Sequence, residues 1–141
     1  MNVSDLTVPQ ISVLRALPLR ECMEFWQGAE EIGKKAGKFE ATVRSLVLAD
    51  LFYLLARVCG RADMVHPWVY ARVREVEARP DGYIDLWARE HFKSSIITFG
   101  LTISDILRDP EITFGFFSHT RPIAKAFLRQ IMREFEGNRM L

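Results

Sequence analysis

The chain has 141 residues, a length that corresponds to one small domain. Hydrophobic residues make up 49% of it and charged residues 26%, which excludes disordered, collagen-like and disulfide-rich proteins. The net charge of +1 favours no class of partner, so any surface for nucleic acid would have to be local. Two cysteines without metal-ligand spacing fit a reducing cytoplasm, and no apolar run approaches the roughly 20 residues that span a bilayer.

Residues 1–80 are predicted to form a helical segment. Apolar side chains recur every three to four residues from Val43 to Val58, which indicates a helix, and Gly60 is a natural stop signal after it. Helices are also predicted from Glu24 to Lys35 and from His66 to Ala78.

The second part of the chain, residues 81–141, has a different pattern. Two short runs rich in aromatic and branched side chains, Tyr83–Ala88 and Ile112–Phe117, are predicted to be strands. Between them, Ile96–Leu107 is apolar most of the way round, as in a buried helix, and an amphipathic helix, Ile123–Phe135, follows. The order strand, helix, strand, helix predicts an α/β fold, with the two strands parallel in a right-handed βαβ unit.

A loop suited to phosphate binding lies between the first predicted strand and the helix after it. It runs from Arg89 to Ser95 and reaches Lys-Ser where the helix begins. Backbone N–H groups at a helix start bind phosphate oxygens. The ammonium group of Lys93 would reach the β- and γ-phosphates, and the hydroxyl of Ser94 would ligate the Mg²⁺ that bridges them.

The same loop lacks both glycines of the Walker pattern. Their positions are occupied here by Trp87 and Phe92. Glycine at these points lets the backbone turn tightly and approach the nucleotide closely. Phe92 must therefore either avoid a positive φ or carry strain. The alternative interpretation is that Lys93-Ser94-Ser95 is only the solvated start of a helix.

The stretch from Asp85 to Thr98 resembles the Walker A region of the large subunit of tailed-bacteriophage terminases, the ATP-driven motor that packages viral DNA into proheads. Members of that family often have a deviant loop, Ala-Arg-x-His-x-Lys-Ser-Thr, followed by an Ile-rich helix, and Ser95 stands where they commonly have Thr. The resemblance covers residues 41–138. It also includes His66-Pro67-Trp68, Arg72, Asp109–Ile112, Phe117–Thr120, Ala124–Leu128 and Glu134–Glu136.

The resemblance implies that the loop binds ATP and Mg²⁺ as in a P-loop NTPase. Arg89 would be a second cation over the phosphates, and His91 and Phe92 would supply backbone amides. The implied nucleotide-binding residues are Arg89, Glu90, His91, Phe92, Lys93, Ser94 and Ser95, with Ser94 also the Mg²⁺ ligand. Alternatively, Arg89 forms a surface ion pair with Glu90 or Asp85, and His91 is an ordinary exposed loop side chain.

Candidate contacts to nucleic acid follow the second predicted strand. In helicase-like motors related to terminases, the loop at this place touches the nucleic-acid backbone. The last helix also has basic residues at four-residue steps, which form a stripe that could lie along DNA. The candidates are Ser118, His119, Thr120, Arg121, Lys125, Arg129 and Arg133. The alternatives are that Thr120 caps the helix and that the stripe is a solvated helix face.

Acidic residues for ATP hydrolysis are missing from the expected places. This class of motor needs an apolar strand that ends in Asp, with a Glu beside it that activates water. After Ser118 the only acids are Glu134 and Glu136, and the upstream run Leu46–Asp50 has a helical period. The resemblance therefore implies that residues 81–141 are the truncated start of an ATPase domain, without catalytic residues or the nuclease domain. The chain alone would then be inactive.

The resemblance further implies partners and a location. The partners would be double-stranded viral DNA, the portal protein and the small terminase subunit, with a homo-oligomeric ring for the intact protein in the cytoplasm of an infected bacterium. An alternative function is a non-enzymatic helical module that binds DNA or a partner chain through its basic last helix. Trp68 and Tyr70 are open to two interpretations, adenine packing or helix packing.

Overall fold

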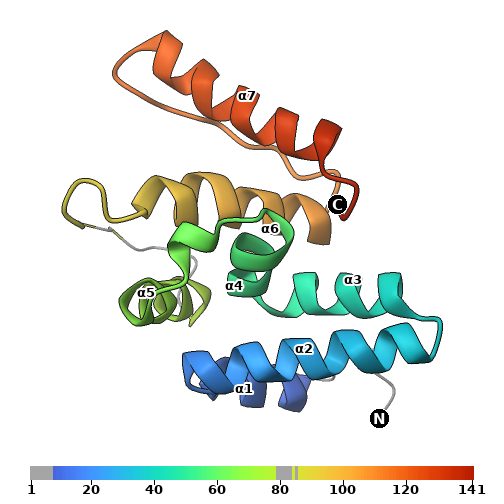
Figure 1. Ribbon diagram of the computed structural model, residues 1–141. Helices are drawn as coiled ribbons and strands as arrows, with labels where there is room; N and C mark the ends of the chain where they lie inside the picture. The colour runs from blue at the N-terminus through green and yellow to red at the C-terminus, as the bar shows by residue number, and fades with distance from the viewer. Residues whose placement is uncertain (1–7, 79–83, 85) are drawn as a thin grey trace.

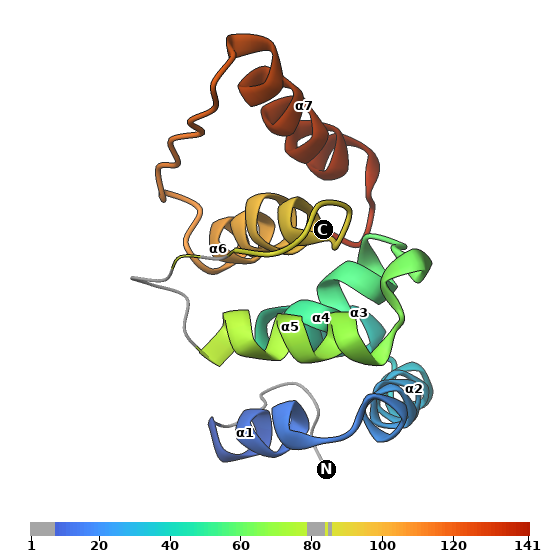
Figure 2. The ribbon, with the colours of Figure 1, turned by 90° about the vertical axis from the view of Figure 1, so that its left-hand side faces the viewer.

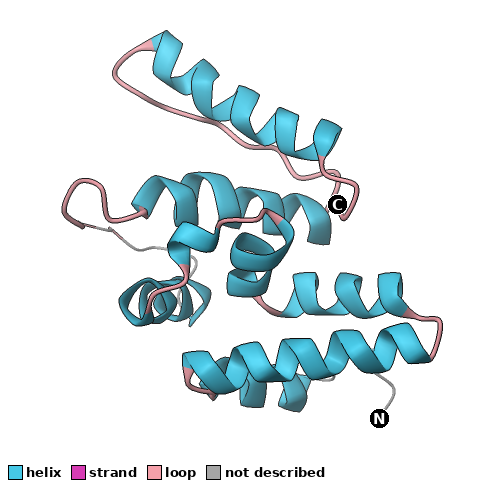
Figure 3. Cartoon of the chain, viewed as in Figure 1, coloured by secondary structure: helices cyan, strands magenta, loops and turns pink. Residues whose placement is uncertain are grey.

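The computed structural model describes residues 8–78, 84 and 86–141, and every regular element in these ranges is a helix (Figures 1 and 3). Two elements, η1 and η3, have the wider π type of turn, and η2 is a 3-10 turn. The elements are α1 Val8–Ala16, α2 Leu19–Lys35, α3 Phe39–Ala49, α4 Leu51–Tyr53, η1 Leu54–Val58, η2 Ala62–Met64, α5 Pro67–Ala78, η3 Ser94–Leu101, α6 Thr102–Arg108 and α7 Arg121–Gly137. None of the helices described is long and apolar enough to cross a bilayer.

The helices predicted in the first part of the chain are present, although their boundaries differ. The predicted helix Glu24–Lys35 is part of α2, which begins earlier, at Leu19, and His66–Ala78 corresponds to α5. No prediction covered α1. The predicted helix Val43–Val58 is interrupted at Asp50, whose backbone is extended with φ −138° and ψ 104°.

Asp50 divides this helix because it caps the part that follows. Its carboxylate accepts hydrogen bonds from the N–H groups of Phe52 and Tyr53, at 2.9 and 3.1 Å, so the side chain satisfies donors that begin α4. Figure 1 shows that α3 and α4 run in different directions. Gly60, with φ 65°, ends the second piece as the sequence predicts.

Helices α2 and α3 form a closely packed pair because one position between them lacks a side chain. A Cβ atom at Gly33 would overlap Thr42 Oγ1. About one turn earlier in α2, the buried carboxylate of Glu30 accepts hydrogen bonds from Tyr53 Oη at 2.9 Å and from Arg57 Nη2 at 2.8 Å. These hydrogen bonds attach the α2–α3 pair to α4 and η1.

The α/β prediction is wrong, because neither predicted strand is a strand. Ile112–Phe117 is an extended connection between α6 and α7, and positions 84 and 86–88 of the first run are irregular; Tyr83 and Asp85 lie outside the described residues. A strand needs a neighbour that pairs with its N–H and C=O groups, and the described residues supply none. Ile84, Leu86 and Phe117 are 83%, 89% and 97% exposed.

The apolar run Ile112–Phe117 was predicted to be a buried strand, but it connects α6 to α7 along one side of α7. Phe114 and Phe116 are half-buried and stack with ring centroids 6.4 Å apart. Together with the α7 residues Ala124 and Leu128 they line one hollow. Their alternation with exposed residues is that of an extended chain with one face on a helix. A continuous apolar run does not distinguish this arrangement from a buried strand.

Helices from both parts of the chain share one core. Figure 2 shows them in successive layers, from α1 and α2 at one end, through α3–α5, to α6 and α7 at the other. The buried cluster joins residues such as Leu46, Leu55 and Val73 to Ile96 and Ile103. The loop Arg89–Ser95 is therefore held against the N-terminal helices.

Candidate functional site

The loop Arg89–Ser95 has a backbone that turns as a glycine-containing loop would. Glu90 has φ 64° and Phe92 has φ 59°, both in the left-handed region. This conformation costs a residue with a side chain about 1–2 kcal/mol. Phe92 occupies the position of the second Walker glycine, and of the two outcomes expected from the sequence, the strained one is observed. The first intrahelical bond after it runs from Ile96 N to Phe92 O, at 2.9 Å.

An open hollow of about 460 Å³ lies inside this turn. It is lined by Arg61 and by every residue from Trp87 to Ser95. Three of these side chains, Arg61, Arg89 and Lys93, carry positive charge, and only Glu90 carries negative charge. The start of the helix lines the same hollow, so the positive end of its dipole adds to this field. The hollow is therefore suited to an anion.

Arg61 reaches the loop from the N-terminal helices. Gly60 turns the chain after η1, and Arg61 then donates from Nη1 to Ser95 Oγ at 3.3 Å. Its guanidinium carbon lies 6.0 Å from the centre of the Phe92 ring, close enough for a cation–π contact. No sequence pattern predicts that Arg61 contacts the loop, because Arg61 and Ser95 are 34 positions apart.

Asp63 holds Arg61 in this orientation. Its carboxylate accepts hydrogen bonds from Arg61 Nε at 3.0 Å and Nη2 at 2.8 Å. The pair lowers the pKa of the Asp63 carboxyl and raises the pKa of Arg61 through these hydrogen bonds. Both side chains are therefore charged over the physiological pH range.

A second hollow, of about 660 Å³, lies on the aromatic side of the loop. Trp68 from α5 forms T-shaped contacts with Trp87 and His91, with ring centroids 6.0 and 5.2 Å apart, and the guanidinium carbon of Arg72 lies 5.8 Å from the centre of the Trp68 ring. Tyr70 faces away into the core, where its hydroxyl donates to Leu17 O at 2.6 Å. Of the two aromatic residues considered for adenine, only Trp68 lies beside the loop.

The remaining loop residues are largely exposed. His91 Nδ1 lies 2.7 Å from the carbonyl oxygen of Arg89, and because a carbonyl only accepts, this nitrogen carries the hydrogen. Arg89 is exposed and lines the cationic hollow. Ser94 is an exposed residue in the first turn of η3, where its hydroxyl can reach a ligand in the hollow.

The structure does not bring the predicted nucleic-acid residues to this loop. Ser118, His119 and Thr120 are exposed, and Thr120 occupies the N-cap position of α7 without a capping hydrogen bond from its side chain. The basic stripe lies on α7, at the end of the molecule away from α1 (Figure 1). Its members, Arg121, Lys125, Arg129 and Arg133, are all exposed.

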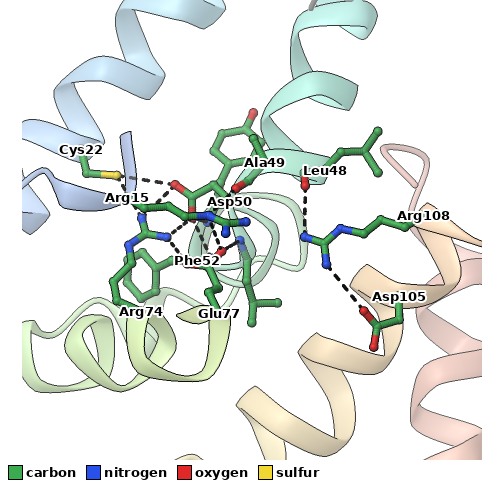
Figure 4. A network of polar contacts seen from close by, with 12 residues as sticks. Arg15, Cys22, Leu48, Ala49, Asp50, Phe52, Arg74, Glu77, Asp105 and Arg108 are labelled. Carbon is green, nitrogen blue, oxygen red and sulfur yellow. Dashed lines mark hydrogen bonds and ion pairs between the residues drawn. The ribbon is translucent and has the colours of Figure 1, made fainter. Parts of the chain in front are cut away.

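The upstream acid that ends Leu46–Asp50 belongs to a buried network (Figure 4). Asp50 is fully buried and accepts from Arg74 Nη1 and Nη2 at 2.9 and 3.0 Å and from Trp26 Nε1 at 3.0 Å. The thiol of Cys22 lies 3.6 Å away, and burial, with the negative charge of Asp50, raises its pKa to about 12. Asp50 therefore stabilises the helix junction and cannot reach a nucleotide.

The residues that the structure describes do not form a preassembled metal site. Among the described residues, no group of three or more His, Cys, Asp or Glu side chains converges on one point. A lone hydroxyl such as that of Ser94 fits Mg²⁺ only when nucleotide phosphates supply further oxygens, as is usual for this ion.

Comparison of the chain with protein-family models, with curated proteins and with solved structures finds no significant match. Its function is therefore argued from the loop, from the two hollows beside it and from the basic helix.

Proposed function

We propose that the chain binds a nucleoside triphosphate on the loop Arg89–Ser95, as the nucleotide-binding part of a phage terminase large subunit. The observation that carries the proposal is the φ of 59° at Phe92. A phenylalanine at the position of the second Walker glycine adopts the backbone that glycine would adopt. Left-handed backbone in bulky residues is concentrated at ligand sites. The loop resemblance to terminases supports the identification of the ligand as ATP.

Each side chain in the cationic hollow has a proposed role. Lys93 binds the β- and γ-phosphates, and Arg89 lies over them as a second cation. The hydroxyl of Ser94 is the chain's own ligand for the Mg²⁺ that accompanies the nucleotide. When bound, the metal neutralises phosphate charge.

The proposal concerns binding rather than turnover by the described residues. The acid of the Leu46–Asp50 run is buried against Arg74. Glu134 and Glu136 lie on α7, and neither lines the hollow. ATP hydrolysis, viral DNA, the portal protein and the small subunit are proposed only for the intact motor, on the strength of the resemblance.

Replacing Lys93 by alanine tests the nucleotide site. We expect Lys93→Ala to weaken Mg-ATP binding about tenfold or more, because charge-assisted hydrogen bonds to the phosphates are lost. Isothermal titration calorimetry measures the dissociation constants. Lys125→Ala removes an exposed lysine on α7 and is the matched control, which should bind like the unmodified chain. Equal affinities for Lys93→Ala and Lys125→Ala would contradict the proposal.

The basic face of α7 supports a second candidate function, binding to DNA. Arg121, Lys125, Arg129 and Arg133 are exposed at successive turns, and within the described residues none of them forms an ion pair. Such a stripe can neutralise a line of backbone phosphates. This function would not require ATP.

Charge reversal on α7 tests the second candidate. We expect the triple variant Lys125→Glu, Arg129→Glu and Arg133→Glu to abolish binding to a double-stranded DNA oligonucleotide in fluorescence anisotropy. The affinity of the unmodified chain should fall as salt is raised, because bound phosphates release counterions. Reversal of three exposed basic residues outside α7, Lys35→Glu, Lys38→Glu and Arg44→Glu, changes the net charge by the same amount and is the matched control. DNA affinity that survives the α7 reversal would exclude this surface.

A further inference from the structure

We propose that Arg61 is a phosphate-binding residue that reads the number of phosphates on the nucleotide. The inference rests on the proposed nucleotide site and adds to it a cation from the N-terminal helices. Arg61 stands outside the loop motif, yet it forms part of the wall of the 460 Å³ hollow that also contains Arg89 and Lys93.

The contacts of Arg61 point its guanidinium at the place where phosphates would lie. Nη1 is 3.3 Å from the hydroxyl of Ser95, the neighbour of the proposed metal ligand Ser94. The group also lies over the ring of Phe92, the residue that turns the loop. The contacts with Phe92 and Ser95 hold the Arg61 side chain against the hollow.

Arg61 has donors left for a ligand after its contacts within the chain. A guanidinium carries five N–H groups. The described contacts engage Nε and one hydrogen each of Nη1 and Nη2. One hydrogen on each terminal nitrogen remains and can donate to phosphate oxygens.

Asp63 sets the strength of this interaction. Its carboxylate occupies the fork formed by Nε and Nη2, and its negative charge offsets part of the positive charge that Arg61 offers to a phosphate. The pair is partly exposed, with side-chain accessibilities of 27% for Arg61 and 54% for Asp63, so an incoming anion can compete with it. Asp63 therefore lowers the affinity of Arg61 for any anion. A nucleotide with more phosphate charge competes better with the Asp63 carboxylate for Arg61.

The test is the affinity of the full chain for Mg-ATP, Mg-ADP and AMP, measured by calorimetry. We expect Arg61→Ala to weaken ATP binding about tenfold while AMP binding changes little, so that the preference for ATP over AMP falls by the same factor. Arg61→Lys should restore part of the preference, and Asp63→Asn should tighten ATP binding. Arg44→Ala removes an exposed arginine of α3 and is the control.

The outcomes separate this proposal from the one on which it rests. ATP binding that is lost in Lys93→Ala but unchanged in Arg61→Ala overturns the role of Arg61 alone. Equal losses of ATP and AMP affinity in Arg61→Ala show a purely structural role and also overturn it. If Arg61→Ala does not fold in circular dichroism, the Arg61→Lys and Asp63→Asn affinities decide. No ATP binding by the unmodified chain overturns both proposals.

Discussion

Asp50 shows how one buried side chain can determine the course of the chain. It is fully buried, it caps α4 through the N–H groups of Phe52 and Tyr53, and it pairs with Arg74 of α5. Glu77 shares Arg74, and burial raises the pKa of its carboxyl although the arginine opposes the shift. Asp50 and Glu77 thus share the guanidinium of Arg74. The resulting network connects α3, α4 and α5.

Substitution of Asp50 by asparagine should therefore strongly destabilise the fold. The amide would keep the shape of the side chain but remove one of the two buried carboxylates that pair with Arg74, so we expect the free energy of unfolding to fall by about 3 kcal/mol. Urea denaturation followed by circular dichroism measures it. Glu24→Gln is the control, because its partner Arg20 is exposed and such surface pairs contribute about 1 kcal/mol or less. Similar losses in both variants would refute this account of Asp50.

Helix α7 illustrates the limit of an argument from amphipathic pattern. The sequence predicts a full apolar face on Ile123–Phe135, and the helix exists, but only Ile131 in it is buried. Leu128 and Met132 remain 46% and 48% exposed. The periodicity of apolar residues identifies α7 as a helix and shows which face packs inward. How deeply that face is buried depends on the elements packed against it, and the sequence of α7 itself does not contain this information.

This shallow packing predicts a difference in local stability between helices. We expect the backbone amides of α7 to exchange with deuterium faster than those of α3, because few apolar contacts oppose local opening of α7. Helix α3 is the internal control, since Thr42, Val43, Leu46, Val47 and Ala49 are buried in it. Hydrogen exchange followed by mass spectrometry compares the two helices in one sample. Equal protection would mean that α7 opens only with the whole molecule.

At the scale of the whole molecule, the sequence predicted local elements better than their assembly. Helices such as α2, α5 and α7 were predicted because each carries its own 3.6-residue period, and Lys93 and Ser94 were chosen as site candidates because they are neighbours in a recognisable motif. The strand predictions failed because apolar composition does not provide a pairing partner. Arg61 was missed because only the packing of η1 against η3 brings it to the loop.

The three tryptophans are divided between the interior and the loop. Trp26 is 4% exposed and donates its indole N–H to Asp50 at 3.0 Å, whereas Trp68 and Trp87 form a pair beside the loop. An indole in a dry interior emits at shorter wavelength than one near water. The chain consequently contains two intrinsic optical reporters, one for the integrity of the core and one for events at the loop. In a Trp26→Phe variant, all the tryptophan fluorescence would come from Trp68 and Trp87 beside the loop. Ligand binding could then be followed by this fluorescence without an attached dye.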